Sequence, residues 1–496
     1  MSTTKITGSL YSIFRRGLAK NPGGRAFTVG GDSLTYAELD AAARRLAGGL
    51  VGNTAGNTAG HTAVGVLAPR GRTAYTGILA GLYAGLTVVP LNPAFPPARN
   101  LAMARAAGVS VLVADGPAAE LGIPVAGEGP ALDEPVPVRP GDVAYVLFTS
   151  GSTGTPKGVP ITHGNLASYF AWAARRFGFT QDDVFSQTFD LTFDCAMFDL
   201  FCAWGAGAQV RDVPPHAYRD LPGYLAAHGV TVWFSTPSAI GAVRRAGGLA
   251  PGSMPGLRWS LFAGEALKCA DAEEWQAAAP AATLENLYGP TELTITITAH
   301  RWTPGSPGLG VNGLAPIGAV NDGHDHLLLD EDGRPAAEEG ELWITGPQLT
   351  PGYLDPKHDH GRFVERDGRV YYNTGDRARR TGGGELVYLG RADSQVQVRG
   401  WRVETAEIDH AVRGLDGVED AVTIGAGNGD TTELVVFYTG VQKSPAEFAR
   451  GLRETLPDGI VPRHYRHFPE LPMNGNRKTD RARLRDLAEA VLRGEA

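Results

Sequence analysis

The chain has 496 residues, which is too long for one ordinary hydrophobic core, so two or more domains are expected. Hydrophobic residues make up 43% and charged residues 20% of the sequence, as in globular proteins, and the formal net charge of -8 argues against a general nucleic-acid-binding protein. Three cysteines without a CxxC pair, and an N-terminus without an apolar signal core, predict a cytoplasmic protein. The longest apolar run, residues 78–91, is too short and too glycine-rich to span a membrane.

The first half of the chain alternates between helix-like and strand-like segments. Apolar residues recur at helical spacing over residues 34–50, and a tandem Asn-Thr-Ala-Gly repeat at 53–63 predicts a surface loop. The alternating segments that follow are 63–67, 73–85, 109–114, 145–148 and 166–177, with a second series from 184 to 235. This alternation predicts an α/β fold of parallel sheets layered with helices.

The second half of the chain changes character twice. Short, glycine-punctuated segments from 341 to 388 predict a β-rich subdomain. After Gly390 the pattern resets, with predicted helices around 404–414 and 445–455 and predicted strands at 421–425 and 433–439. We therefore expect an N-terminal core of residues 1–392 and a small, mobile α+β C-terminal domain of residues 393–496.

The stretch from Thr149 to Gly158 is the most informative loop. All of its positions are Gly, Ser, Thr, Pro or Lys, and it follows the apolar run 143–148, which predicts a buried strand. Such a loop exposes backbone N–H groups, hydroxyls and the ammonium of Lys157, which suits a phosphate chain. It is not a Walker loop, because Pro156 stands where that pattern needs glycine and Lys157 is not followed by Ser or Thr. The loop is therefore predicted to handle phosphate in another way.

Further motifs follow this loop in a fixed order. They are Asn286-Leu-Tyr-Gly-Pro-Thr-Glu292, Tyr372-Asn-Thr-Gly-Asp376, Gly390-Arg-Ala-Asp-Ser-Gln-Val-Gln-Val-Arg-Gly-Trp-Arg-Val-Glu404 and Leu471-Pro-Met-Asn-Gly-Asn-Arg-Lys-Thr-Asp480. Together with the loop, this set resembles the adenylate-forming enzymes, and in particular the amino-acid adenylation domains of nonribosomal peptide synthesis. The resemblance covers nearly the whole chain. It implies that a carboxylate attacks the α-phosphate of Mg-ATP and that a thiol, usually carrier-protein phosphopantetheine, then takes the acyl group.

The resemblance implies a nucleotide site. Lys157 and its loop would grip the β- and γ-phosphates, Tyr288 would stack on adenine, and Asp376 would accept the ribose hydroxyls. Glu292 would hold Mg²⁺, which needs only one or two carboxylates beside phosphate oxygens. The implied ATP-binding residues are Thr149, Ser150, Gly151, Ser152, Thr153, Gly154, Gly264, Glu265, Asn286, Tyr288, Gly289, Thr291, Asp376 and Arg391.

The resemblance also assigns roles in the C-terminal domain. Lys478 matches the catalytic lysine that bridges the substrate carboxylate and the α-phosphate, a preorganised charge of the kind worth roughly 3–4 kcal/mol. Asp393 matches the hinge about which the small domain rotates between the half-reactions. Gly400 would line the thiol tunnel, where a side chain would block the pantetheine. Gln397 departs from the lysine of many members.

The pocket for the amino acid is implied in the same way. Of two overlapping Phe-Asp pairs, the amine-binding carboxylate falls on Asp194, whereas Asp190 is the candidate for a helix cap. The implied pocket residues are Asp194, Cys195, Phe198, Phe234, Leu261, Ala263, Leu287, Ile295, Thr296 and Lys478. Apart from the two charged residues the wall is apolar or weakly polar, which disfavours charged and strongly polar substrates.

The pocket resembles that of free-standing proline-activating enzymes, from which it departs at Cys195, Phe198 and Thr296. Proline is thus the leading expectation, and another small or medium apolar amino acid, including a β-amino acid, stays open. Because no carrier segment follows Lys478, a separate carrier protein is the expected acceptor. Coenzyme A or an amine is the alternative acceptor, and a non-catalytic nucleotide-binding relative is a third hypothesis, disfavoured by the retained Lys157, Glu292, Asp376 and Lys478.

Overall fold

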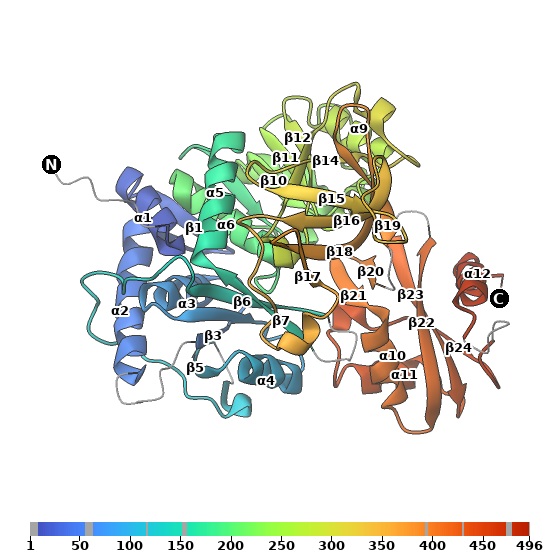
Figure 1. Ribbon diagram of the computed structural model, residues 1–496. Coiled ribbons are helices and arrows are strands. Elements are labelled where there is room, and N and C mark those ends of the chain that lie inside the picture. The colour runs from blue at the N-terminus through green and yellow to red at the C-terminus, as the bar shows by residue number, and fades with distance from the viewer. Residues whose placement is uncertain are drawn as a thin grey trace. The chain divides into compact units, whose positions relative to one another are not determined.

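The computed structural model describes residues 8–54, 63–115, 118–150, 156–391, 395–428, 431–472 and 479–495 (Figure 1). The chain forms two compact units. Unit 1 consists of Met1–Pro93, Met103–Leu147 and Gly158–Gly390, and unit 2 of Ala94–Ala102, Phe148–Lys157 and Arg391–Ala496. The predicted boundary between residues 392 and 393 and most of the tandem repeat lie outside the described residues.

One sheet of unit 1 has the strand order β5-β3-β4-β6-β7. Its strands are β3 (Ala63–Leu67), β4 (Thr87–Leu91), β5 (Val109–Ala114), β6 (Val143–Thr149) and β7 (Lys157–Thr162). β3 runs parallel to β4 and β5, and β4 runs parallel to β6. Every residue of β3 and β7 is buried, as expected for the apolar strand β3 when both of its faces are covered.

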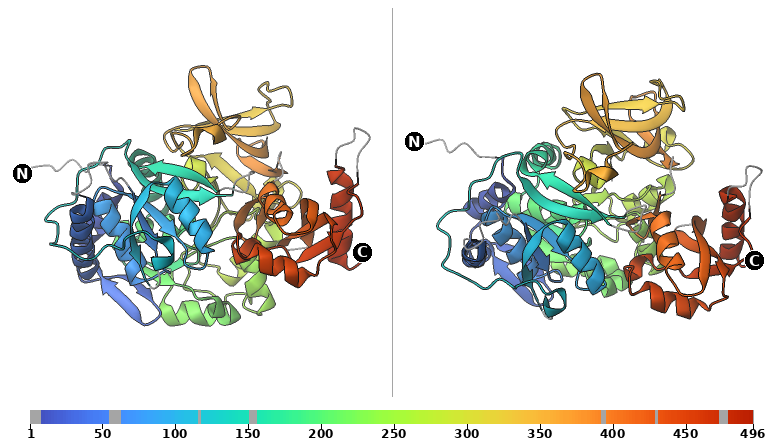
Figure 2. Two further views of the ribbon diagram at one scale, coloured as in Figure 1. Left: turned by 90° about the horizontal axis from the view of Figure 1, so that it is seen from below. Right: turned by 60° about the horizontal axis from the view of Figure 1, so that its bottom comes forward.

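The other sheet of unit 1 is long and mixed, with the order β15-β16-β18-β19-β14-β13-β12-β11-β10-β8-β9-β1-β2 and β17 paired to β18. Its strands are β1 (Arg25–Val29), β2 (Asp32–Thr35), β8 (Val184–Gln187), β9 (Gln209–Asp212), β10 (Val232–Ser235), β11 (Trp259–Phe262), β12 (Thr283–Tyr288), β13 (Thr298–Arg301), β14 (Pro316–Val320), β15 (Asp325–Leu329), β16 (Glu339–Thr345), β17 (Phe363–Arg366), β18 (Arg369–Arg380) and β19 (Leu386–Arg391). The run β12-β11-β10-β8-β9-β1 is parallel, whereas β12–β13, β13–β14, β14–β19, β16–β18 and β15–β16 are antiparallel pairs. Strands β15 to β18 form a β-rich extension at one end of unit 1 (Figure 2).

The helices of this part of the chain are α1 (Leu10–Lys20), α2 (Tyr36–Thr54), α3 (Arg72–Tyr83), α4 (Pro97–Ala106), α5 (His163–Phe177), α6 (Asp194–Ala206), α7 (Leu221–His228), α8 (Ser238–Arg245) and α9 (Cys269–Ala278). Short 3₁₀ helices are η1 (Ala118–Leu121), η2 (Pro215–Asp220), η3 (Thr291–Leu293), η4 (Ser306–Leu309) and η5 (Pro356–His358). A capping box of Thr162 and Asn165 starts α5. Every residue of α6 is buried, so this helix runs inside the core. Among the described helices, none combines the length and apolar character that a membrane span requires.

The central parallel strands separate two cores. Phe234, Leu261 and Leu287 of β10, β11 and β12 lie in the core that contains α6. Their neighbours Trp233 and Phe262 lie in the second core, with α7, α8 and α9. The alternation follows from the two-residue period of a strand. The fold therefore brings apolar side chains of neighbouring strands to one face, toward α6, and confirms the predicted α/β class.

Unit 2 contains a hairpin and a second small sheet covered by helices. Its elements are β20 (Gln395–Val398), β21 (Trp401–Glu404), α10 (Thr405–Arg413), β22 (Val418–Asn428), β23 (Thr431–Gly440), α11 (Pro445–Leu452), η6 (Asp458–Ile460), β24 (His464–His467) and α12 (Arg481–Arg493). α10 and α11 pack on one face of the β22-β23-β24 sheet, and α12 packs on the other. The sequence analysis did not predict α12, whose Leu484, Ala488 and Val491 form a narrow apolar stripe among charged residues.

Gly17 provides a test of how tightly α1 packs against α6. A Cβ atom at Gly17 would lie 1.7 Å from the backbone oxygen of Trp204. Alanine improves helix propensity by about 1 kcal/mol, but overpacking against backbone costs roughly 1–3 kcal/mol or more. Because the new Cβ would meet backbone, which cannot move aside easily, we expect Gly17→Ala to lower the Tm by about 2 °C in a thermal melt. Gly23→Ala, where no atom lies within 4 Å of the new Cβ, is the control and should leave the Tm unchanged.

Candidate active site

The ends of the central parallel strands and the start of α6 form a buried apolar wall in unit 1. Sheets of this kind bind ligands at the carboxyl ends of their strands. The predicted pocket residues that lie together in the α6 core, each at most 8% exposed, are Cys195, Phe198, Phe234, Leu261, Ala263, Leu287 and Ile295. Thr296, the polar member of the predicted wall, is fully buried.

Asp194 is the first residue of α6 and is 8% exposed. The Thr291 hydroxyl and the Cys195 backbone N–H donate to its carboxylate, whereas the buried Oδ2 atom has no hydrogen-bond partner among the described residues. Burial, with a smaller contribution from the nearby charge of Glu292, raises the pKa of Asp194 to about 6. A buried carboxylate with an unpartnered oxygen is suited to a cation that arrives with a ligand.

Asp190 has a different role from Asp194. It accepts hydrogen bonds from Asn92 Nδ2 at 2.9 Å and from the backbone N–H of Thr192 at 3.0 Å. Because the N-cap residue of α6 is Phe193, Asp190 does not cap the helix, contrary to the predicted alternative. Asp190 closes the turn that precedes the helix.

Aromatic rings close the apolar wall. The ring centroids of Phe198 and Phe234 lie 5.0 Å apart, and those of Phe189 and Phe234 lie 4.9 Å apart, both in edge-to-face arrangements. The hydroxyls of Tyr169 and Thr296 are 3.1 Å apart and buried. The wall therefore offers little polar surface beyond the Asp194 carboxylate, and this favours a small or medium apolar group.

Glu292 lies in η3, directly after Thr291, and is 1% exposed. Tyr353 donates from its hydroxyl to Glu292 Oε1 at 2.5 Å, and the hydroxyls of Tyr353 and Tyr372 are 3.3 Å apart. Thr291 joins Glu292 to Asp194, because its side chain bonds the Asp194 carboxylate. The carboxylates of Asp194 and Glu292 thus lie near each other beside the apolar wall.

Tyr288 and Asp376 are brought together by a direct hydrogen bond. The Tyr288 hydroxyl donates to Asp376 Oδ2 at 2.5 Å, and the backbone N–H of Asp376 donates to Thr374 Oγ1 at 3.0 Å. Asp376 is 5% exposed. The adenine-stacking and ribose-binding candidates are therefore neighbours in unit 1.

The other predicted nucleotide residues of unit 1 have structural contacts of their own. Gly264 follows β11 with a positive φ of 86°, and Glu265 Oε2 accepts from the backbone N–H of Ser238 at 2.8 Å. Asn286 Nδ2 donates to the carbonyl oxygen of Pro316 at 2.7 Å. A Cβ atom at Gly289 would lie 2.7 Å from the Cα atom of Thr296, so only glycine permits this approach.

The predicted residues of unit 2 lie around the β20–β21 hairpin. Ser150 Oγ donates to the carbonyl oxygen of Arg402 at 2.7 Å and accepts from the backbone N–H of Glu404 at 3.0 Å. Lys157 Nζ lies 3.6 Å from Glu404 Oε1, and both side chains are buried. Thr149 ends β6 next to Ser150. The contacts join the start and the end of the phosphate-loop candidate to one hairpin.

Two further predicted residues of unit 2 have a clear local role. Arg391 donates to Gln395 Oε1. Gly400 has a φ of 85° and follows Arg399 with a φ of 50°, and the two form the turn between Val398 and Trp401. A two-residue turn of this kind requires positive φ at both positions, which accounts for glycine there without reference to a tunnel. The predicted residues Gly151, Ser152, Thr153, Gly154, Asp393 and Lys478 lie outside the described residues.

Tyr353, Tyr169 and Glu404 contact predicted site residues but were missed by the sequence analysis. Glu404 ends the quoted motif 390–404 but received no role from it, whereas Tyr353 and Tyr169 are ordinary buried residue types at a long sequence distance from their partners. Only the fold reveals them.

Comparisons with known proteins agree on one family. The model of the AMP-binding enzyme family matches residues 14–354, more than half of the chain. The chain is 33% identical to the L-proline–[L-prolyl-carrier protein] ligase of Streptomyces coelicolor, with 96% of each chain covered. Other curated relatives are longer synthetases, of which the chain spans between 6% and 45%.

Solved structures give the same result. The crystal structure of IdnL7 is 53% identical with a TM-score of 0.75, covering 99% of this chain and 100% of that one. The Vibrio cholerae adenylation domain AlmE, solved with glycyl-adenosine-5'-phosphate, is 27% identical with a TM-score of 0.84, covering 98% and 99%. The chain therefore belongs to the AMP-binding enzyme family.

Proposed function

We propose that the protein activates an amino acid with an apolar side chain as an aminoacyl-adenylate and passes it to the thiol of a separate carrier protein. The observation that carries the proposal is the buried Asp194 carboxylate, with its unpartnered Oδ2 atom, beside an apolar wall. A substrate ammonium would pair with that carboxylate. The carrier ligase from Streptomyces coelicolor and AlmE with its glycyl-adenylate support the reaction class by similarity.

The substrate side chain would lie against the apolar wall. Phe198 and Phe234 limit its depth, while Cys195, Ile295 and Thr296 contribute small or medium side chains. This composition supports proline or a similar small or medium amino acid, including a β-amino acid. A charged side chain would meet no partner there.

ATP would bind with adenine on Tyr288 and the ribose hydroxyls on Asp376, with Gly264, Glu265, Asn286, Gly289 and Thr291 in the surrounding loops and Arg391 as a further contact. Glu292 would hold Mg²⁺ together with phosphate oxygens and water, a donor set that fits this hard cation. Among the described residues there is no ready-made cluster of three or more metal-binding side chains, which is compatible with a metal held largely by the nucleotide. When bound, the ion would neutralise charge on the departing phosphates.

In the first half-reaction a substrate carboxylate oxygen attacks the α-phosphorus, and the bond to the oxygen that leads to the β-phosphate breaks. Pyrophosphate leaves, gripped by Lys157 and the loop from Thr149 to Gly154, while Lys478 stabilises the charge at the α-phosphate. In the second half-reaction the carrier thiolate attacks the acyl carbon, and AMP leaves. We assign Lys478 to a mobile domain of residues 393–496 that turns about Asp393, with Gly400 lining the thiol path.

Amino-acid-dependent exchange of pyrophosphate into ATP tests the first half-reaction. We expect the highest exchange with proline, alanine or another small apolar amino acid, and at least about 100-fold less with aspartate or lysine. Propionate, which is alanine without its ammonium, should be equally poor. Absence of exchange with every amino acid, while a control enzyme works, would contradict the proposal. Mass spectrometry identifies the acceptor. If the aminoacyl group is found on coenzyme A or on an amine and not on a carrier protein, only the carrier assignment is contradicted.

The pH dependence of the amino-acid KM tests the role of Asp194. Since its pKa is raised to about 6, the carboxylate is ionised above that pH and becomes neutral as the pH falls below it. A substrate ammonium then loses its partner, so the KM should rise about tenfold per pH unit below pH 6. The KM for ATP, measured in parallel, serves as the control. In Asp194→Asn the amino-acid KM should be high and independent of pH; a pH profile like that of the wild type would show that the amine binds elsewhere.

Lys478→Ala separates the two half-reactions. Loss of a preorganised charge at the α-phosphate should reduce exchange by about 100- to 1,000-fold. Transfer from a preformed aminoacyl-adenylate to the carrier should stay within about threefold, because this step does not use the lysine. Lys20→Ala, on the exposed end of α1, is the control. An equal loss of adenylation and of transfer would refute the assignment of Lys478 to the first half-reaction only.

A further inference from the structure

The loop after Glu292 has an unusual backbone. Thr294 and Ile295 adopt positive φ values of 59° and 68°, a region that β-branched residues rarely occupy. Both side chains are buried, at 0% and 1% exposure. Such a conformation persists only where the surrounding structure holds it, and it tends to occur at functional sites.

Gln348 holds this loop from one side. Its amide nitrogen Nε2 lies within hydrogen-bond distance of three carbonyl oxygens, those of Leu293 at 3.0 Å, Thr294 at 3.2 Å and Thr296 at 3.0 Å. The backbone oxygen of Gln348 accepts from Thr294 Oγ1 at 2.6 Å. Gln348 is completely buried, so water cannot replace these bonds. One amide thus places its donors beside three buried carbonyl groups of the loop.

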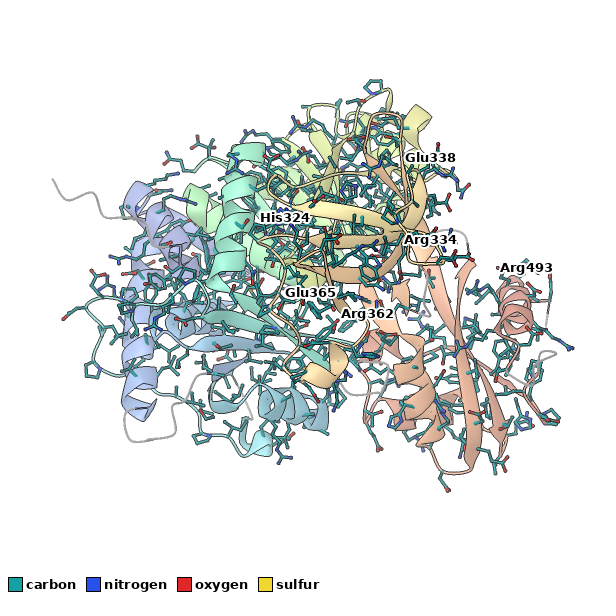
Figure 3. All side chains as sticks on the ribbon, viewed as in Figure 1. His324, Arg334, Glu338, Arg362, Glu365 and Arg493 are labelled. Carbon is teal, nitrogen blue, oxygen red and sulfur yellow. The ribbon has the colours of Figure 1, made fainter. Side chains whose placement is uncertain are left out.

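A second layer fixes Gln348. Asn321 Nδ2 donates to Gln348 Oε1 at 3.1 Å and to the carbonyl oxygen of Thr296 at 3.1 Å. His324, labelled in Figure 3, accepts from the backbone N–H of Gln348 at 3.1 Å through Nε2. A Cβ atom at Gly346 would lie 2.4 Å from the His324 ring, so glycine makes room for it. The amide of Gln348 therefore has a defined position and orientation.

The clamped loop carries both parts of the amino-acid site. Thr291 and Glu292, which precede it, include the hydroxyl that bonds Asp194. Ile295 and Thr296, which lie in it, belong to the pocket wall, and Thr296 is also bonded to Tyr169. A shift of the backbone here would move the wall and the partner of the amine-binding carboxylate together.

We propose that Gln348, supported by Asn321, is a positioning residue that sets amino-acid affinity and selectivity by holding the strained segment 293–297. The inference rests on the proposed function. Gln348 does not touch the substrate; it acts through the loop. An amide is needed because it supplies two N–H donors and one acceptor at a single point, whereas an apolar side chain of the same length supplies none.

Gln348→Met tests the proposal, because methionine keeps the length and removes the hydrogen bonds. We expect the amino-acid KM in the exchange assay to rise about tenfold or more, with kcat lowered less than about threefold and the KM for ATP within about twofold. The ratio of kcat/KM between proline and larger apolar amino acids should also shrink. Gln348→Glu, which when protonated keeps one donor, should restore part of the affinity.

Gln276→Met is the matched control. Gln276 Nε2 donates to the carbonyl oxygens of Ala279 and Ala282, both at 3.0 Å, in a part of unit 1 that carries no predicted site residue. This variant should lower the Tm as Gln348→Met does but leave the amino-acid KM and the selectivity unchanged.

Several outcomes would overturn the inference. A lowered Tm with a uniform loss of kcat for all amino acids and an unchanged KM would give Gln348 a structural role only, as would wild-type behaviour of every variant. If Gln348→Met fails to fold, the amino-acid KM is measured for Gln348→Glu and Asn321→Ala instead. An unchanged KM in both variants would refute the inference. An inactive wild type would refute the proposed function itself, whereas an active wild type with unaffected variants refutes only this inference.

Discussion

A carboxylate buried in an apolar environment is the constraint on which the candidate site depends. Asp194 receives hydrogen bonds from Thr291 and Cys195, and these neutral donors do not cancel its charge. Glu292 adds a second negative charge nearby and raises the pKa of Asp194 further. The site is therefore poised for cations that come with its ligands. Under the proposed function, a substrate without an ammonium would leave the charge unpaired, so that an apolar wall could still discriminate strongly.

The fold supplies this arrangement from elements far apart in the sequence. The parallel strands β10, β11 and β12 end side by side and line up Phe234, Leu261 and Leu287 toward α6. α6 begins at Asp194, where the helix N-terminus favours a carboxylate and offsets part of its burial penalty. The loop after β12 then brings Thr291 and Glu292 to the same place. Strands, helix and loop are each arranged as in other parallel sheets, and the candidate site lies where these elements end.

Much of this could be predicted from the sequence, for identifiable reasons. Residues 63–67 and 109–114 match β3 and β5 because continuous apolar runs bounded by polar residues leave few alternatives. The family resemblance of the motifs assigned Asp194, Glu292 and Asp376 to the candidate site, and their roles in ligand binding stay predictions. The strand order of the mixed sheet and helix α12 were not predicted. Strand order depends on partners that are distant in the sequence. In α12 the charged residues outnumber the residues of the apolar stripe, so the helical pattern is weak.

The support of the site was the least predictable part, and the reason is physical. Gln348 lies 52 to 55 residues from the carbonyl groups that it bonds, and nothing in its neighbourhood marks it as special. A local rule would assign glycine, not Thr294 and Ile295, to a backbone with positive φ. The violation of that rule is itself informative, because strain of this kind requires compensation elsewhere in the fold. Candidate ligand-binding groups can thus be proposed from motifs in the sequence, whereas the groups that hold them are identified from the contacts that keep a strained segment in place.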